Sequence, residues 1–231
     1  KKPLLLHLPT KHSFYMRMSY LSSHWRLFLL SLGLLTRIAP AVNATDDEMG
    51  AACLYYPITG ALLGSRITLP LWLGSSVDPW IQAWGYAGLS PWITRALHHD
   101  GLADVIDALG SGKTGDGFRS VLKDSRIGAF GTVGLIMILL GQVVCAAACL
   151  KQGLLAPLLY APLFARSLPV FFALTAPVSP FASLGRIFAA APLKKAATVS
   201  CVSIFLGALM LMEAAPAICC LVLASILIVF F

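Results

Sequence analysis

Charged residues are scarce in this chain of 231 amino acids. Only 12% of its residues are Asp, Glu, Lys or Arg, while 58% are hydrophobic. A soluble globular domain usually has about 25% charged residues, because its surface must be hydrated. The shortage of charge argues against a water-soluble protein and indicates that most of the surface faces lipid.

The cysteines also lack any spacing that would indicate a metal site or a disulfide framework. All six lie inside apolar runs, none belongs to a CxxC pair, and none has a histidine at metal-ligand spacing. A cysteine in such surroundings behaves as a small hydrophobic residue. The cysteines therefore point to no redox or zinc chemistry.

Long apolar runs are what the sequence does contain. A bilayer-spanning helix needs roughly 20 mostly apolar residues. The runs are 51–73, 80–97, 127–150, 154–176, 196–212 and 216–231. Helices satisfy their backbone hydrogen bonds internally, as lipid requires, and these runs are too continuous for barrel strands. The sequence thus predicts an all-α fold, a polytopic transmembrane helical bundle of about six spans.

The basic residues suggest how such a bundle is oriented. The net charge is +7, and Lys and Arg gather near the N-terminus, around residues 95–126 and around residues 186–195. The positive-inside rule places all three clusters in the cytoplasm. All three clusters can lie on the same side of the membrane only if residues 25–42 do not cross it and form a short re-entrant or interfacial segment instead. We further expect residues 1–24 to be a basic N-terminal segment that need not be native, residues 25–231 to be one integral membrane domain, and no nucleic-acid partner.

One region departs from the apolar pattern, the stretch from His98 to Arg126. Its first acidic residues, Asp100, Asp104 and Asp107, have the spacing i, i+4, i+7. On a helix that turns ~100° per residue they fall within an arc of about 60°. Three carboxylates on one face repel each other unless a cation lies between them. The alternative is a solvated face of a cytoplasmic loop, although such faces usually mix charges of both signs.

Basic residues follow these acids. Asp124 lies between Lys123 and Arg126. Mg²⁺ binds through a few carboxylates together with substrate phosphates, and Lys and Arg are suited to phosphate oxygens. The combination favours a site for phosphoryl transfer, which depends on positioning and charge neutralisation. For Lys123 the positive-inside rule is an equally good explanation.

Three more polar residues are candidates for a functional role. Arg37 and Arg166 lie in apolar surroundings, and an ionisable group within a membrane usually faces a partner or a wet cavity. Snorkelling to the interface explains Arg37 better than Arg166, which lies in the middle of a run. His98 and His99 adjoin Asp100, and either could orient a carboxylate or act as a base. His98 is the candidate, and a bystander role is its alternative.

Several segments also match a known pattern in the same order. They are HHDGLADVID at 98–107, KDSRIGAFG at 123–131, LTRIAP at 35–40 and YPITGALLG at 56–64. Together they resemble the cobalamin synthase family, the adenosylcobinamide-GDP ribazoletransferases. The likeness extends from about Phe28 to Phe231, and the acidic core is its most specific part.

The resemblance implies a reaction and assigns roles to residues. Such enzymes are Mg²⁺-dependent proteins of the bacterial inner membrane that act late in cobalamin biosynthesis. They join α-ribazole, or its 5′-phosphate, to adenosylcobinamide-GDP and release GMP. By resemblance, Asp100, Asp104, Asp107 and Asp124 are metal ligands, His98, Lys123 and Arg126 are catalytic, and Arg37, Ser125 and Arg166 bind substrate.

Other functions stay open at this point. A CDP-alcohol phosphotransferase also keeps acids on membrane helices, but its pattern has Ala-Arg where Ala103 here precedes Asp104. A cation transporter would place its acids within spans rather than between them. The family's glycine-rich C-terminal motif does not occur in the sequence, and Ser183-Leu184-Gly185 lacks the family's acid. A truncated, non-catalytic membrane protein is therefore a third alternative, and a homo-oligomer is compatible with all of them.

Overall fold

The computed structural model describes residues 11–40, 43–74, 76–175, 183–189 and 191–210. Every regular element in these ranges is helical, which confirms the all-α prediction. In chain order the helices are α1 (Lys11–Leu35), α2 (Asp46–Ala51), the 3-10 helix η1 (Ala52–Tyr55), α3 (Tyr56–Leu73), α4 (Pro79–Ile93), α5 (Leu97–Gly110), α6 (Gly115–Leu122), α7 (Ala129–Lys151), α8 (Ala156–Thr175), α9 (Ser183–Ala189) and α10 (Leu193–Met210).

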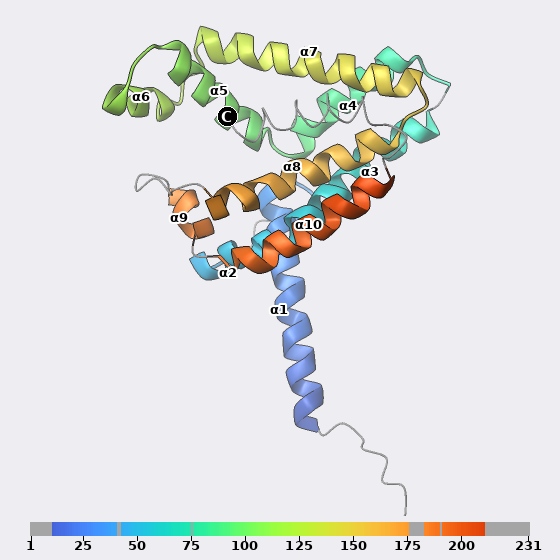
Figure 1. The fold of residues 1–231 in the computed structure, drawn as a ribbon, viewed down its shortest axis with the longest axis vertical. Helices are drawn as coiled ribbons and strands as arrows, with labels where there is room; N and C mark the ends of the chain where they lie inside the picture. Colours follow the sequence, from blue (N-terminus) through green and yellow to red (C-terminus); the bar gives the residue numbers. More distant parts are fainter. Residues whose placement is uncertain (1–10, 41–42, 75, 176–182, 190, 211–231) are drawn as a thin grey trace, which may run out of the picture.

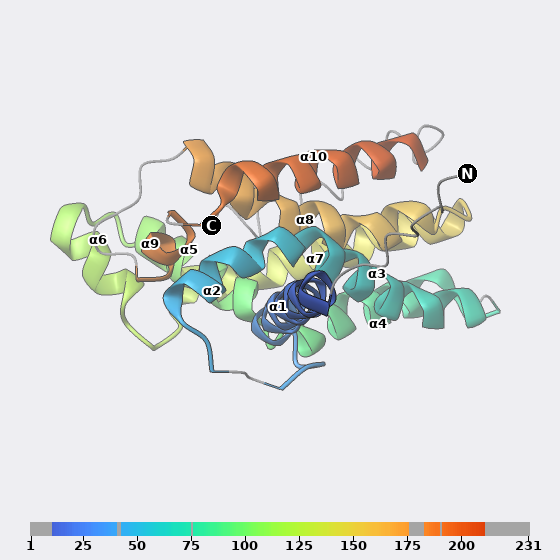
Figure 2. The same cartoon turned by 90° about the horizontal axis from the view of Figure 1, so that it is seen from below.

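The longer helices form two packing groups (Figures 1 and 2). In the α7 group, α7 packs against α4 and α5; in the α8 group, α8 packs against α3 and α10. The groups meet where α3 contacts α4 and where α7 contacts α8. Figure 1 shows α1 projecting away from both groups, with α6 at one end of the molecule beside α5.

Two glycines allow α3 and α8 to come into backbone contact. A Cβ atom on Gly60 would lie 2.5 Å from the carbonyl oxygen of Pro162, and one on Gly64 would lie 1.9 Å from that of Leu159. Any side chain at these positions would push the helices apart. Small residues four positions apart are a common device for close helix packing in membranes, so the family-like segment 56–64 has a structural role here.

The largest apolar core joins the two groups. Leu63 and Ile67 of α3, Tyr86 of α4 and Leu158 of α8 are all buried in it. The Tyr86 hydroxyl donates a hydrogen bond to the Leu158 carbonyl oxygen at 2.9 Å, which satisfies the one polar group that this ring brings into the core. The site described below is built on the helices that this core holds in place.

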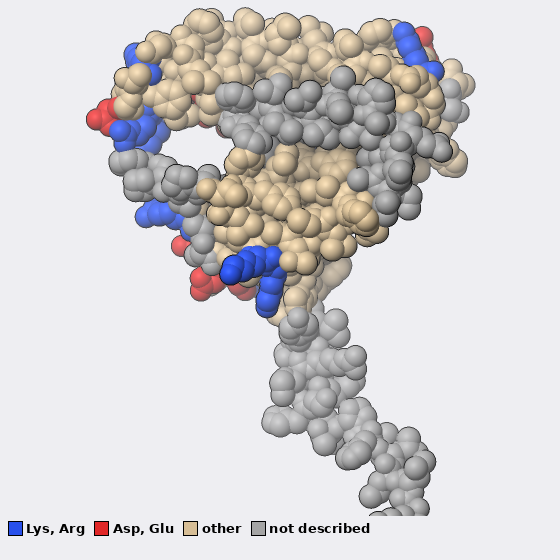
Figure 3. Space-filling model, viewed as in Figure 1, with Lys and Arg blue, Asp and Glu red and all other residues tan. Residues whose placement is uncertain are grey.

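The surface of the bundle fits a membrane environment. Within the described ranges, α7 with 23 residues and α8 with 20 are long and apolar enough to cross a bilayer. One face of α7 exposes large apolar side chains, which lipid accommodates better than water; they are Phe130, Val133, Ile136, Met137, Leu140 and Val144. Figure 3 shows Lys, Arg, Asp and Glu at the two ends of the long helices, with other residues between them.

The predicted number of spans is not confirmed. Apart from α7 and α8, no described helix meets the length and hydropathy expected of a span, and the run 216–231 lies outside the described residues. The run 51–73 is divided among α2, η1 and an 18-residue α3 that carries Arg66. The run 80–97 is interrupted because α4 ends at Ile93, four residues before α5 begins.

The predicted re-entrant segment at 25–42 also has a different form. Its first part is the end of the continuous helix α1, which begins at Lys11. The helix stops where the Thr36 hydroxyl donates to the Leu32 carbonyl oxygen at 2.7 Å and accepts the Ile38 N–H at 3.1 Å. A position of this segment at the membrane interface stays a prediction.

Candidate functional site

The acidic residues lie on α5, which follows an unusual turn. Arg95 and Ala96 have φ values of 55° and 53°, a left-handed conformation that costs roughly 1–2 kcal/mol per non-glycine residue. After this turn, His99, Leu102 and Ala103 are buried against the bundle. The strained turn therefore sets the rotation of α5, and with it the direction in which its acids point.

Two of the acids have unpaired carboxylates. Asp100 is exposed and Asp104 is half-buried, and neither side chain takes part in the hydrogen bonds and ion pairs of the described residues. Partial burial, together with the charges of Asp100 and Asp107, raises the pKa of Asp104. A cation bound on this face would relieve that repulsion.

Asp107 has a different environment. Its Oδ2 accepts the Gly128 N–H at 2.7 Å and its Oδ1 accepts the Gly131 N–H at 2.8 Å. These donors lie at the N-terminus of α7, where the helix dipole favours a negative charge. A Cβ atom on either glycine would lie 2.3 Å from an Asp107 carboxylate oxygen. Asp107 therefore docks α7, and the segment just before it, against α5.

The segment before α7 carries the predicted phosphate-binding residues. The Arg126 guanidinium donates to both carboxylate oxygens of Asp124, from Nε at 3.0 Å and from Nη2 at 2.7 Å. This contact lowers the pKa of Asp124 to about 2. Lys123 and Ser125 are exposed, and Lys123 is the C-terminal cap of α6. The segment thus presents two cations and a hydroxyl on the surface.

The four predicted metal ligands do not form one cluster. No group of three or more His, Cys, Asp and Glu side chains among the described residues could hold a metal ion. Asp107 is bonded to α7 and Asp124 to Arg126, which leaves Asp100 and Asp104 available. Such a pair fits Mg²⁺, which often binds one or two carboxylates and takes its other ligands from water and substrate phosphates.

A second polar group lies on the buried side of α5. His99 and Arg166 are each only 7% exposed. Nε2 of His98, both ring nitrogens of His99 and Nε of Arg166 have no hydrogen-bond partner. Burial, and then the nearby Arg166 guanidinium, lower the pKa of His98 to about 3 and lower that of His99 as well. Both rings are therefore neutral and lie close to a buried cation.

Arg37 lies apart from both groups, beside the end of α4. Its guanidinium lies 4.5 Å from the centroid of the Trp92 ring, and its backbone N–H donates to the Ile93 carbonyl oxygen at 2.8 Å. A cavity of about 380 Å³ opens nearby between α1, η1 and the turn before α5. It is lined by Leu30, Gly33, Leu34, Met49, Ala52, Thr94, Arg95 and Leu97.

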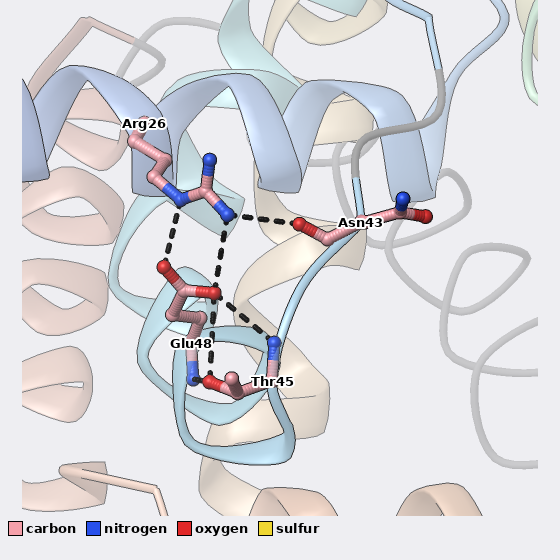
Figure 4. Close-up of polar contacts among 4 residues, drawn as sticks. All are labelled: Arg26, Asn43, Thr45 and Glu48. Carbon is pink, nitrogen blue, oxygen red and sulfur yellow. Dashed lines mark hydrogen bonds and ion pairs between the residues drawn. The ribbon is translucent and has the colours of Figure 1, made fainter.

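A polar clamp holds the α1 and α2 walls of this cavity together (Figure 4). The Arg26 guanidinium donates to the Glu48 carboxylate at 2.7 Å and to the Asn43 carbonyl oxygen at 2.8 Å. Glu48 in turn accepts the Thr45 N–H at 3.0 Å and completes a capping box at the start of α2. These contacts fix the otherwise short helix α2 against α1.

The sequence indicates most of these residues. It offers both His98 and His99 as residues that could orient a carboxylate or act as a base, and His98 alone is the candidate. The place of His99 among Leu102, Ala103 and Ile106 at helical spacing is the signal for the buried face of α5. Arg95 was counted only as a topological charge, and no sequence signal reveals its left-handed conformation. Roles for Arg37, Ser125 and Arg166 in substrate binding stay predictions.

Comparisons with known proteins place the chain among relatives. A family profile described as cobalamin-5-phosphate synthase matches residues 27–231. An adenosylcobinamide-GDP ribazoletransferase of Nitratidesulfovibrio vulgaris strain Miyazaki F is 47% identical over 173 residues, which are 74% of this chain and 69% of that protein. The protein of the same name from strain DP4 is 44% identical over 160 residues, 69% of this chain and 65% of its own length.

More distant relatives match a shorter part. The adenosylcobinamide-GDP ribazoletransferase of Leptothrix cholodnii is 38% identical over 117 residues, 49% of this chain and 44% of that protein. The aligned part of the chain thus spans about two thirds of the length of the two Nitratidesulfovibrio proteins and under half of the length of the Leptothrix protein. No solved structure gives a significant match.

Proposed function

The chain belongs to the cobalamin-5-phosphate synthase family, and on this basis we propose that it is an adenosylcobinamide-GDP ribazoletransferase. This membership confirms the family predicted from the sequence. In the proposed reaction a hydroxyl oxygen of α-ribazole, or of its 5′-phosphate, attacks the phosphorus that carries adenosylcobinamide. The bond from that phosphorus to the GMP oxygen breaks, GMP leaves, and the hydroxyl loses its proton.

The docking of α7 by Asp107 supports the proposal beside the family membership. Its two hydrogen bonds to Gly128 and Gly131 bring the start of α7 against α5. The segment that carries Lys123 and Arg126 comes directly before this docked helix start. Phosphoryl transfer requires acids that hold a metal ion and cations that contact phosphate oxygens, and α5 and the segment before α7 carry both kinds of group.

Each group then has a task in the proposed site. Asp100 and Asp104 would hold Mg²⁺, which supplies neutralisation of the charge that develops on the diphosphate. Lys123 and Arg126 would contact phosphate oxygens, and Ser125 would donate a hydrogen bond to them. Asp124 orients the Arg126 guanidinium through their two hydrogen bonds.

The membrane setting is also part of the proposal. Two apolar helices and the apolar exposed face of α7 support a protein embedded in lipid. We place it in the bacterial inner membrane as a multi-pass protein, with residues 98–126 on the cytoplasmic side. This agrees with the basic cluster that surrounds the acids.

GMP release from adenosylcobinamide-GDP and α-ribazole tests the reaction, with and without Mg²⁺. We expect metal-dependent product from the full chain and none from Asp104→Asn. Asp116→Asn is the matched control, because Asp116 is an exposed α6 acid paired with Arg119, and it should keep full activity. An active Asp104→Asn protein would show that the metal ligands are misassigned.

Two other readouts separate the alternatives. Turnover of a labelled CDP-alcohol would replace the proposal with a lipid phosphotransferase. Cation flux into liposomes without any GMP release would replace it with a transporter.

A further inference from the structure

Arg166 is a buried cation that the proposed roles leave without a partner. It lies in the middle of α8 and is 7% exposed, and its Nε has no hydrogen-bond partner. None of the ion pairs in the described ranges includes it. An arginine in an apolar setting normally faces an anion or a wet cavity, because an unpaired buried charge is strongly unfavourable.

The described acids do not supply the missing anion. Asp100 is exposed to solvent, Asp107 is bonded to the start of α7, and Asp124 is bonded to Arg126. Burial raises the pKa of Asp104 most, followed by the charges of Asp100 and Asp107, and no cation contributes. No carboxylate of the described residues therefore pairs with Arg166.

Two histidines within electrostatic reach of Arg166 are suited to bind an anion with it. His98 and His99 lie close enough for its charge to disfavour their protonated forms. A neutral imidazole still offers one N–H donor, and three of the four ring nitrogens of this pair are buried without a partner. Tyr86, which also lies within electrostatic reach of Arg166, already donates its hydroxyl hydrogen to Leu158.

We propose that Arg166, His98 and His99 form a buried subsite that receives a phosphate oxyanion of a substrate. The guanidinium fork matches two phosphate oxygens at once, and the histidine N–H groups would donate to the others. The subsite deepens the proposed function and rests on it. It gives His98 a binding role on the inner side of α5, opposite the exposed Asp100.

Two groups in the proposed reaction could supply the phosphate oxyanion, the diphosphate of the donor and the 5′-phosphate of the acceptor. Steady-state kinetics of Arg166→Met with α-ribazole and with α-ribazole 5′-phosphate distinguish them. A KM increase on the order of tenfold or more for the phosphorylated acceptor alone would assign its 5′-phosphate. The same increase for the donor, with either acceptor, would assign the diphosphate.

The conservative and control variants sharpen this test. Arg166→Lys keeps the charge without the fork, so its KM should lie between those of the wild type and Arg166→Met. His99→Gln should raise the same KM as Arg166→Met does. Arg66→Met removes an exposed arginine from α3 and should leave every KM unchanged. A fall in kcat with all KM values unchanged would overturn the proposal.

Thermal unfolding of the full chain in detergent gives a readout that does not depend on activity. Pyrophosphate without Mg²⁺ should raise the melting temperature of the wild type and of Arg66→Met, but not that of Arg166→Met. Because Arg166 is unpaired without ligand, Arg166→Met should melt no lower than the wild type. A sharp drop in its melting temperature would show that the arginine is a structural residue and would contradict the proposal.

The two assays also separate this inference from the proposed reaction. If the wild type forms no GMP but pyrophosphate stabilises it and not Arg166→Met, the subsite stands and the reaction is wrong. If GMP forms and Arg166→Met keeps both its KM values and its stabilisation by pyrophosphate, the reaction stands and the subsite is wrong.

Discussion

A single methyl group at position 131 should weaken the contact between α5 and α7. The Cβ atom of Gly131→Ala would lie 2.3 Å from Oδ2 of Asp107 and 2.8 Å from the carbonyl oxygen of Ala103. The carboxylate cannot keep its place against that methyl group. It has to move, and the 2.8 Å hydrogen bond from the Gly131 N–H is lost.

The expected effect follows from two opposing contributions. A hydrogen bond to a charged group stabilises a fold by about 1.5–3 kcal/mol. Replacement of a helical glycine by alanine stabilises the helix by at most about 1 kcal/mol. The net loss of unfolding free energy for Gly131→Ala is therefore roughly 0.5–2 kcal/mol, before any cost of the contact with Ala103.

Gly141→Ala on the same helix is the matched control. A Cβ atom there would meet nothing within 4 Å, so the protein should gain up to about 1 kcal/mol. The two variants should differ in unfolding free energy by about 1.5–3 kcal/mol, which corresponds to a difference in melting temperature on the order of 3–12 °C for a chain of this size. Thermal unfolding followed by tryptophan fluorescence measures it, and equal melting temperatures would refute the docking role of Asp107.

Three further outcomes are expected. Asp104→Asn should melt no lower than the wild type at neutral pH, because the raised pKa of Asp104 means that its ionised form destabilises the fold above that pKa. Mg²⁺ with pyrophosphate should stabilise the wild type more than this variant. Equal stabilisation of the two proteins would contradict the metal site. Gly64→Ala should lower the free energy of unfolding by several kcal/mol, since its Cβ would lie 1.9 Å from a backbone oxygen of α8. Gly85→Ala is the control and should leave the stability unchanged, because a Cβ atom there meets nothing within 4 Å. A fully stable Gly64→Ala protein would contradict the backbone contact. The Arg26 guanidinium lowers the pKa of Glu48 from 4.5 to about 2. The clamp therefore stabilises the fold above pH 4.5, and this stabilisation is lost as the pH falls through 2. Glu48→Gln should flatten this part of the profile of melting temperature against pH, and an unchanged profile would show that the clamp contributes nothing.

The acidic face of α5 was predictable because it depends on local geometry. Asp100, Asp104 and Asp107 lie within one helix, as the i, i+4, i+7 spacing indicates. Their separate tasks were not predictable, since the environment of Asp107 depends on glycines 21 and 24 residues further along the chain. Spacing alone treats the three carboxylates as equivalent, and only tertiary packing distinguishes them.

The number of spans could not be predicted from hydropathy. Hydropathy treats residues 80–97 as one run, but two consecutive left-handed residues, Arg95 and Ala96, divide the chain there. Neither residue favours that conformation by itself, so no residue type marks the break. Two long apolar helices agree with the membrane environment that the composition predicts. The positions at which the chain breaks into helices depend on packing.

The backbone contact between α3 and α8 at Gly60 and Gly64 has a mechanical consequence. Because backbone lies against backbone there, with no side chains to adjust, α3 and α8 have to move as one rigid body that carries Arg166. Asp104 belongs to the other packing group, which is held together by α7. The apolar core joins these two groups, so a substrate that contacts both residues would meet a preformed site rather than assemble one.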